Sequence, residues 1–127
     1  MNKDRHHSNN DAKLINGVIE VKLTEVQTPE ALIALKQQII AWSKDGQRDA
    51  IINVSPAKMG SPETRAEAER FFSGLPYRRF AIWGGSPPVN LGIKSLLEMH
   101  SDGDHVKIFL HEDDARAWLD EDYPGTN

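Results

Sequence analysis

The chain of 127 residues contains no cysteine. Disulfides and thiolate metal sites are therefore excluded, and this composition suits a reducing compartment such as the cytoplasm. The sequence also has no apolar run approaching the roughly 18 residues of a membrane span, and its first residues lack the apolar segment of a secretory signal. We expect a cytoplasmic protein that is not an integral membrane protein.

Clustered positive charge is also missing. Lys and Arg number 15 against 19 Asp and Glu, so the net charge is −4 and the pI is near 5.7. Binding to phosphate backbones or anionic membranes depends on clustered basic side chains that displace counterions. We therefore expect no nucleic-acid partner. The sequence shows no internal repeat, and its length suits one domain with a single core.

A repeated pair of residues gives the strongest indication of the fold. A Ser or Thr is followed at once by Pro at Thr28-Pro29, Ser61-Pro62 and Ser86-Pro87, each time where a strand-like run gives way to a helical pattern. The hydroxyl oxygen accepts hydrogen bonds from first-turn amides, and Pro fits the next position because it has no amide hydrogen to leave unsatisfied. The pattern predicts repeated strand-to-helix units.

The remaining signals complete the order of elements. Asn16-Gly17 between two strand-like runs predicts a hairpin, and the run 50–54, apolar on nearly both faces, predicts an interior parallel strand. The predicted strands are 12–15, 18–23, 50–54, 79–83 and 106–110. The predicted apolar stripes of the helices are Leu32, Leu35, Ile39 and Trp42; Ala68, Phe71, Phe72 and Leu75; Val89, Ile93, Leu96 and Leu97; and Ala115, Trp118 and Leu119.

These elements define one α/β domain with a mainly parallel or mixed sheet, an N-terminal hairpin and about four helices. We expect residues 1–10 to be a disordered leader, residues 11–120 to form the domain, and residues 121–127 to be a flexible tail.

The order of elements and several segments resemble the STAS-like family, which includes bacterial anti-sigma-factor antagonists and an uncharacterised branch. The family's topology is similar to that of CRAL-TRIO lipid-binding domains. The segments that carry the resemblance are Asn16-Gly17-Val18-Ile19, Phe80-Ala81-Ile82-Trp83-Gly84, Val106-Lys107-Ile108-Phe109 and 112–119. They are core strands and a terminal helix, so the resemblance implies a STAS-like fold over about residues 12–119.

The resemblance also singles out Ser61. In regulatory members of the family, a serine or threonine at this helix start is phosphorylated, which switches binding to a kinase or an anti-sigma factor. The family's switch is Asp-Ser-Ser-Gly or Asp-Ser-Thr-Gly, whereas this chain has Met59-Gly60-Ser61-Pro62, with Glu63 where it would repel a phosphate. Ser61 is therefore either a phosphoswitch or a simple helix N-cap.

The carboxyl ends of the strands are where open α/β sheets bind ligands. The residues that this edge brings together as a candidate ligand or partner surface are Asn53, Ser55, Trp83, Gly85, Ser86 and His111. Gly84-Gly85-Ser86 could cradle a phosphate, but Pro87 and Pro88 remove two amide donors, and the glycines match no nucleotide-binding motif. A tight turn is the simpler interpretation.

Catalysis and metal binding have weaker support. His111 could serve as a base towards Ser61 or Ser86, yet no Gly-x-Ser-x-Gly motif is present. His100, His105 and His111 lack metal-ligand spacing. We expect no catalytic residue, no metal and no cofactor.

The three tryptophans and one short basic segment are interpreted without a functional role. Trp42, Trp83 and Trp118 all fall on predicted buried faces, with Trp83 placed so that it could also face a pocket. Tyr77-Arg78-Arg79 is a small basic patch that we interpret as a solvated rim.

Three functions follow. The leading hypothesis is a non-enzymatic regulatory or protein-interaction domain, docking a kinase or anti-sigma-like protein through the helix that starts at Ser61. The alternative is a carrier or sensor of a small lipophilic ligand held between sheet and helices, for which no room remains if Trp42, Phe71, Phe72 and Trp83 fill that layer. A remote alternative is a serine/histidine hydrolase. The hairpin's edge strand would allow a homodimer.

Overall fold

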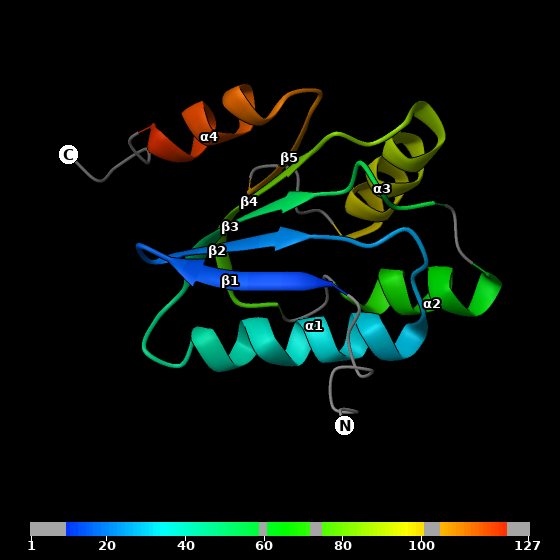
Figure 1. Cartoon of the computed structure of the whole chain (residues 1–127), viewed down its shortest axis with the longest axis horizontal. Helices are drawn as coiled ribbons and strands as arrows, with labels where there is room; N and C mark the ends of the chain where they lie inside the picture. Colours follow the sequence, from blue (N-terminus) through cyan, green and yellow to red (C-terminus); the bar gives the residue numbers. More distant parts are fainter. Residues whose placement is uncertain (1–9, 59–60, 72–74, 101–104, 122–127) are drawn as a thin grey trace.

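A computed structural model describes residues 10–58, 61–71, 75–100 and 105–121, and of residues 96–100 it describes the backbone alone. In this part of the chain, five strands and four helices alternate (Figure 1). They are β1 (Asp11–Ile15), β2 (Val18–Lys22), α1 (Pro29–Trp42), β3 (Arg48–Asn53), α2 (Pro62–Phe71), β4 (Tyr77–Trp83), α3 (Pro87–His100), β5 (Val106–Phe109) and α4 (Glu112–Asp120).

The strands form one mixed sheet in the order β1-β2-β3-β4-β5. β1 and β2 pair antiparallel, and each later pair is parallel. The predicted α/β domain with an N-terminal hairpin is therefore confirmed.

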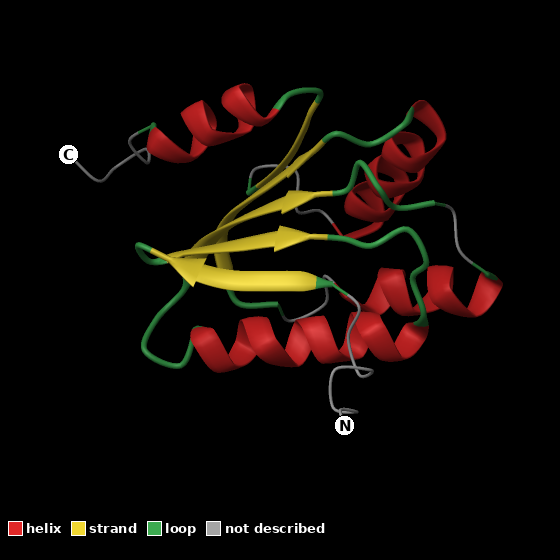
Figure 2. Cartoon of the chain, in the orientation of Figure 1, coloured by secondary structure: helices red, strands yellow, loops and turns green. Residues whose placement is uncertain are grey.

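Helices cover the two faces of the sheet unequally. Each crossover joins neighbouring parallel strands, and right-handed crossovers in a constant direction place α1, α2 and α3 on the same face. α4 follows the last strand and packs on the opposite face, over β3, β4 and β5 (Figures 1 and 2). Among the described elements, no helix covers the part of that face formed by β1 and β2.

Two cores result. In the larger core, Ile19, Ile52 and Phe80 of the strands pack against Leu35 and Ile39 of α1, and all five side chains are buried. In the smaller core, the buried residues of β3, β4 and α4 are Ile51, Ala81, Ala115 and Trp118. Successive side chains of a strand point to the two cores in turn: in β4, Phe80 and Ile82 face the larger core, whereas Ala81 and Trp83 face the smaller one.

Local signals explain the starts of the elements. Asn16 has φ 52° and Gly17 has φ 82°, which is the pair of positive angles that a two-residue hairpin turn needs. The Thr28 hydroxyl accepts a hydrogen bond from the Ala31 amide at 3.1 Å, and Pro29 is the first helical residue. The predicted hairpin and helix starts are confirmed.

Some boundaries differ from the prediction. α1 ends at Trp42 with Ser43 as its C-cap, whereas the sequence signal for the end of this helix is the later pair Asp45-Gly46. β4 begins at Tyr77, two residues early, because a register irregularity between β3 and β4 lets both Tyr77 and Phe80 face the larger core. Phe72 and the side chains of Leu96 and Leu97 lie outside the described residues.

The solvated rim predicted for Tyr77-Arg78-Arg79 is wrong. Arg79 is 6% exposed, and its Nη1 donates hydrogen bonds to the Trp118 carbonyl at 2.6 Å and the Glu121 carbonyl at 3.1 Å. Its guanidinium also lies 5.2 Å from the centre of the Trp118 ring. A cation there complements the last carbonyls and the negative end of α4, so Arg79 attaches that helix to the sheet.

Asn10 belongs with the domain. Its Oδ1 accepts hydrogen bonds from the Thr24 amide at 3.1 Å and from Gln27 Nε2 at 2.8 Å. The rest of the predicted leader and residues 122–127 of the predicted tail lie outside the described residues.

Candidate functional site

Two hollows flank the carboxyl edge of the sheet, one on each face. We call them the apolar cavity, between the sheet and α1, α2 and α3, and the polar hollow, between the hairpin and α4. The apolar cavity is lined mainly by aliphatic side chains, whereas the polar hollow is lined mainly by charged and polar side chains.

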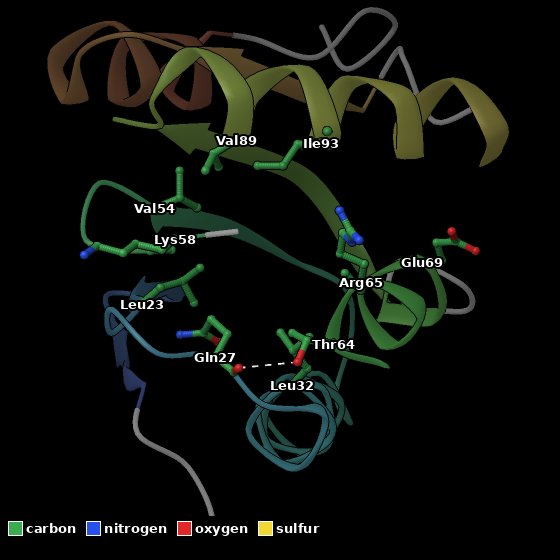
Figure 3. Close-up of a pocket in the computed structure, with 13 residues that line it drawn as sticks. Leu23, Gln27, Leu32, Val54, Lys58, Thr64, Arg65, Glu69, Val89 and Ile93 are labelled. Atoms are coloured by element: carbon green, nitrogen blue, oxygen red, sulfur yellow. Dashed lines mark hydrogen bonds between the residues drawn. The ribbon is translucent and has the colours of Figure 1, made fainter. Parts of the chain in front are cut away.

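The apolar cavity has a volume of about 240 Å³. Its lining comes from the loops after β2 and β3 and from all three helices (Figure 3): Leu23, Gln27, Leu32, Val54, Ala57, Lys58, Thr64, Arg65, Ala68, Glu69, Val89, Gly92 and Ile93. A further space of about 100 Å³ adjoins it and reaches the core at Phe71 and Phe80. The two spaces share the lining residues Leu23, Leu32, Val54, Ala68 and Ile93.

Small side chains leave this space open. Ala57, Ala68 and Gly92 line it, and a Cβ added to Gly92 would meet no atom of the surrounding structure within 4 Å. Of the aromatic side chains expected to fill the layer, Trp42 and Phe71 pack in the larger core without lining the apolar cavity, and Trp83 packs with the smaller core on the opposite face. Phe72 lies outside the described residues. The space between the sheet and the three helices is therefore not completely filled by the described side chains.

Charged side chains surround the mouth of the apolar cavity. Lys58 Nζ lies 2.5 Å from Glu25 Oε2, and this exposed pair lowers the pKa of Glu25 and raises the pKa of Lys58, chiefly through their hydrogen bond. Arg65 and Glu69 lie one turn apart on α2. Among the described residues, none forms an ion pair or a side-chain hydrogen bond with Arg65.

Ser61 lies beside this cavity, at the start of α2. Its Oγ accepts a hydrogen bond from the Thr64 amide at 3.1 Å, and its carbonyl accepts one from the Arg65 amide at 2.9 Å. The hydroxyls of Ser61 and Thr64 are 3.0 Å apart, and Thr64 Oγ1 lies 3.4 Å from the Gln27 carbonyl. The N-cap interpretation of Ser61 is confirmed, and the phosphoswitch stays a prediction.

The glycine loop after β4 is a packed turn. Gly84 has φ 88°, and a Cβ there would lie 3.0 Å from the Ser55 Cβ. Asn53 Oδ1 accepts a hydrogen bond from the Ser55 amide at 2.9 Å, while Asn90 Nδ2 donates one to the Gly85 carbonyl at 3.1 Å. Gly84 and Gly85 are explained by these close contacts, because the neighbouring residues leave no room for a side chain at either position.

The polar hollow has a volume of about 210 Å³ and lies where α4 leaves the hairpin uncovered. At its centre Arg116 donates hydrogen bonds to Glu20 of β2 at 2.9 Å and to Glu112 at 2.7 Å. These two bonds, Glu20 first, raise the pKa of Arg116 above its usual range. This cluster was not predicted from the sequence. Two signals for it were available: Glu20 lies on the polar face of its strand, and Glu112 and Arg116 are four residues apart.

The structure places the candidate residues at several positions around the carboxyl edge of the sheet. Asn53 and Trp83 line the polar hollow, whereas Ser61 starts a helix on the opposite face. Ser86 and His111 are exposed at the starts of α3 and α4, and His111 makes no side-chain cap hydrogen bond. These residues therefore lie at separate places around the carboxyl edge, because alternate residues of β3 and β4 point to opposite faces, and the ligand or partner surface stays a prediction.

The described residues give no support to serine/histidine catalysis or to metal binding. Within the described ranges, no hydrogen bond joins His111 to Ser61 or Ser86. The same part of the chain holds no group of three or more His, Asp or Glu residues placed to bind a metal ion. Among the helices described, none has the length and apolar character needed to cross a membrane.

Solved structures place this architecture in a known fold class. Four helices and a five-stranded mixed sheet in one α/β domain make the fold STAS-like, as the sequence predicted. No family model matches the sequence, and no curated protein matches it.

Two of the similar structures are determinations of the protein TM1081. The solution structure matches with a TM-score of 0.60 at 10% identity, covering 87% of this chain and 88% of that chain. The crystal structure, described as "a putative anti-sigma factor antagonist" from Thermotoga maritima, matches with a TM-score of 0.57 at 12% identity, covering 92% and 99%. At this identity the likeness shows the fold alone.

Proposed function

We propose that the protein is a non-enzymatic regulatory domain that binds a protein partner through an exposed face of α2 that begins in its first turn. The α2 docking face consists of the exposed residues Ser61, Pro62, Glu63 and Arg70. The observation that carries the proposal is the capped, solvent-exposed start of α2 in a STAS-like fold. The description of the Thermotoga maritima protein supports a regulatory role at the level of the fold.

The start of α2 is held in one conformation by its neighbours. The Ser61 and Thr64 hydroxyls contact each other, and Thr64 reaches the Gln27 carbonyl. Gln27 is fixed in turn by hydrogen bonds with Asn10 and with the Thr24 carbonyl. A preorganised surface loses less conformational entropy on binding, which favours docking of a folded partner.

Phosphorylation of Ser61 would be the natural switch for this face. A phosphate would add about −1.5 to −2 charges beside Glu63 and the first amides of α2. We propose that this change releases an acidic partner surface or recruits a basic one.

Charge reversal tests the docking face. Glu63→Lys alters its exposed first turn, and Arg70→Gln removes a charge two turns later. Glu67 is a poor probe because its side chain is only 13% exposed and is paired with Arg70. Lys44→Glu, exposed beyond the far end of α1, is the matched control.

The assay is capture of native partners from the source organism, quantified by mass spectrometry, with melting temperatures measured for every variant. Glu63→Lys should lower capture of at least one partner about tenfold, while Lys44→Glu leaves it unchanged. Equal capture by all the folded variants would remove the α2 docking face from consideration.

The apolar cavity favours a second candidate function, a carrier or sensor of a small lipophilic ligand. Its lining is contributed by three helices and by the loops after β2 and β3, and most of these side chains are apolar, as is usual for pockets that bind small ligands. A homodimer through β1, where Leu14 and Ile15 are exposed, also stays a prediction; sedimentation velocity tests it directly.

A further inference from the structure

We propose that the apolar cavity binds the hydrocarbon chain of a medium-length aliphatic monocarboxylate and that Arg65 binds its carboxylate. The inference rests on the second candidate function and specifies the class of ligand. Four observations carry it: the volume of the cavity, the satisfied polar groups in its lining, Gly92, and the charges at its mouth.

The volume sets the size of the ligand. A cavity of about 150 Å³ holds benzene, with its six carbon atoms, so the apolar cavity of about 240 Å³ has room for about ten non-hydrogen atoms. A chain that entered the adjoining space of about 100 Å³ would gain room for about four more. A chain of about ten to fourteen carbons fits.

The uncharged polar side chains of the lining, Thr64 and Gln27, already have partners. Thr64 Oγ1 contacts the Ser61 hydroxyl and the Gln27 carbonyl. The Gln27 amide exchanges hydrogen bonds with Asn10 and donates to the Thr24 carbonyl. An apolar chain therefore enters without leaving a polar group of Thr64 or Gln27 unpaired, whereas a polar chain would find few free partners.

Gly92 keeps the cavity open. It lies inside α3, where glycine stabilises a helix less than alanine does. Packing does not require glycine there, because an added Cβ would meet nothing of the surrounding structure within 4 Å. The missing side chain is thus explained by the space that it leaves in the cavity.

Arg65 is the cation available at the mouth. Lys58 is already paired with Glu25, whereas the described residues give Arg65 no ion-pair partner. In Figure 3, Arg65 extends from α2 between Ile93 and Thr64. A guanidinium offers five donors in a planar fork that matches a carboxylate. Glu69 lines the same cavity and would repel a second negative charge, which favours a monoanion.

Calorimetric titration of the full chain with sodium decanoate and with 1-decanol tests the head-group assignment. Arg65→Gln should weaken decanoate binding about tenfold, because one charge-assisted hydrogen-bonded pair is lost, and should change decanol binding less than twofold. Glu69→Gln should strengthen decanoate binding about twofold to threefold. Lys44→Gln, the exposed control, should change neither.

A second arm tests the location of the hydrocarbon chain. Gly92→Leu should abolish binding of both probes, and Gly92→Ala, a smaller change, should weaken both. In the wild-type chain, decanoate should shift the methyl resonances of Val89 and Ile93, which line the cavity. Decanoate binding that survives Gly92→Leu and leaves those methyl resonances unmoved would place the site elsewhere.

The failures can be told apart. If both probes bind but Arg65→Gln binds decanoate as tightly as wild type, the assignment of Arg65 is wrong and the carrier function remains. If neither probe binds the wild-type chain, this inference and the carrier function are both wrong, while the α2 docking face is unaffected.

Discussion

Replacing Ser61 by alanine should destabilise the protein, whereas replacing it by aspartate should not. Ser61→Ala removes the oxygen that accepts the Thr64 amide at 3.1 Å, and it also removes the hydroxyl that contacts Thr64 Oγ1. Loss of a serine N-cap costs about 1 kcal/mol, within a range of about 0.5 to 2 kcal/mol. In a domain of this size, about 1 kcal/mol corresponds to a fall in melting temperature of about 4 °C.

Ser61→Asp keeps an accepting oxygen at the cap and adds a negative charge at the positive end of α2. Its free energy of unfolding should therefore stay within about 0.5 kcal/mol of wild type. Urea unfolding followed by tryptophan fluorescence measures both variants, since Trp118 is buried and Trp83 is half-buried in the folded chain. An alanine variant as stable as wild type would refute the capping argument.

The same pair separates the two interpretations of Ser61. If Ser61 is a switch, the stable aspartate variant should change partner capture while the alanine variant retains it. If both variants capture the partner equally, Ser61 is a cap and nothing more.

Three further predictions concern stability and ionisation. Arg79→Met should lower the free energy of unfolding by about 2 kcal/mol, because charge-assisted hydrogen bonds to the Trp118 and Glu121 carbonyls are lost, and urea unfolding would show it. Gly92→Ala should raise that free energy by about 0.5 to 1 kcal/mol in the ligand-free chain, and a loss of stability instead would show that the open space there is misjudged. The pKa of the Glu25 carboxyl should lie below 4.5 in an NMR titration and return towards it in Lys58→Gln; because the folded-state pKa is lowered, the pair's contribution to stability is present above the unfolded pKa and is lost as pH falls through the folded one.

Much of the fold could be predicted because its signals are local. A hairpin turn needs only Asn16-Gly17, and a helix start needs only a hydroxyl residue followed by proline. Sequential parallel strands with right-handed crossovers then leave one arrangement for the first three helices.

The position of the last helix could not be predicted in the same way. α4 follows the final strand, so no crossover rule fixes which face it covers. Arg79 and Arg116 attach it through contacts that span 39 and 96 residues of sequence. Such distant pairs carry no periodic signal, and this is why Arg79 was misassigned to a solvated rim.

The candidate site was predicted in part for a similar reason. The alternation of β3 was readable, but without knowing which face α4 covers, Asn53 and Trp83 could not be separated from the side that holds Ser61. The apolar cavity depends on how three helices pack around small residues such as Ala68 and Gly92. A cavity is a property of that packing and leaves no motif.

Hydrogen exchange of the chain with and without its captured partner tests the docking proposal most directly. If the partner docks on α2, amides of the chain should be protected from exchange in the first turns of α2, from Ser61 onward, and in the adjoining segment around Gln27. Protection confined to the β1–β2 hairpin or to α4, with α2 unchanged, would contradict the docking proposal.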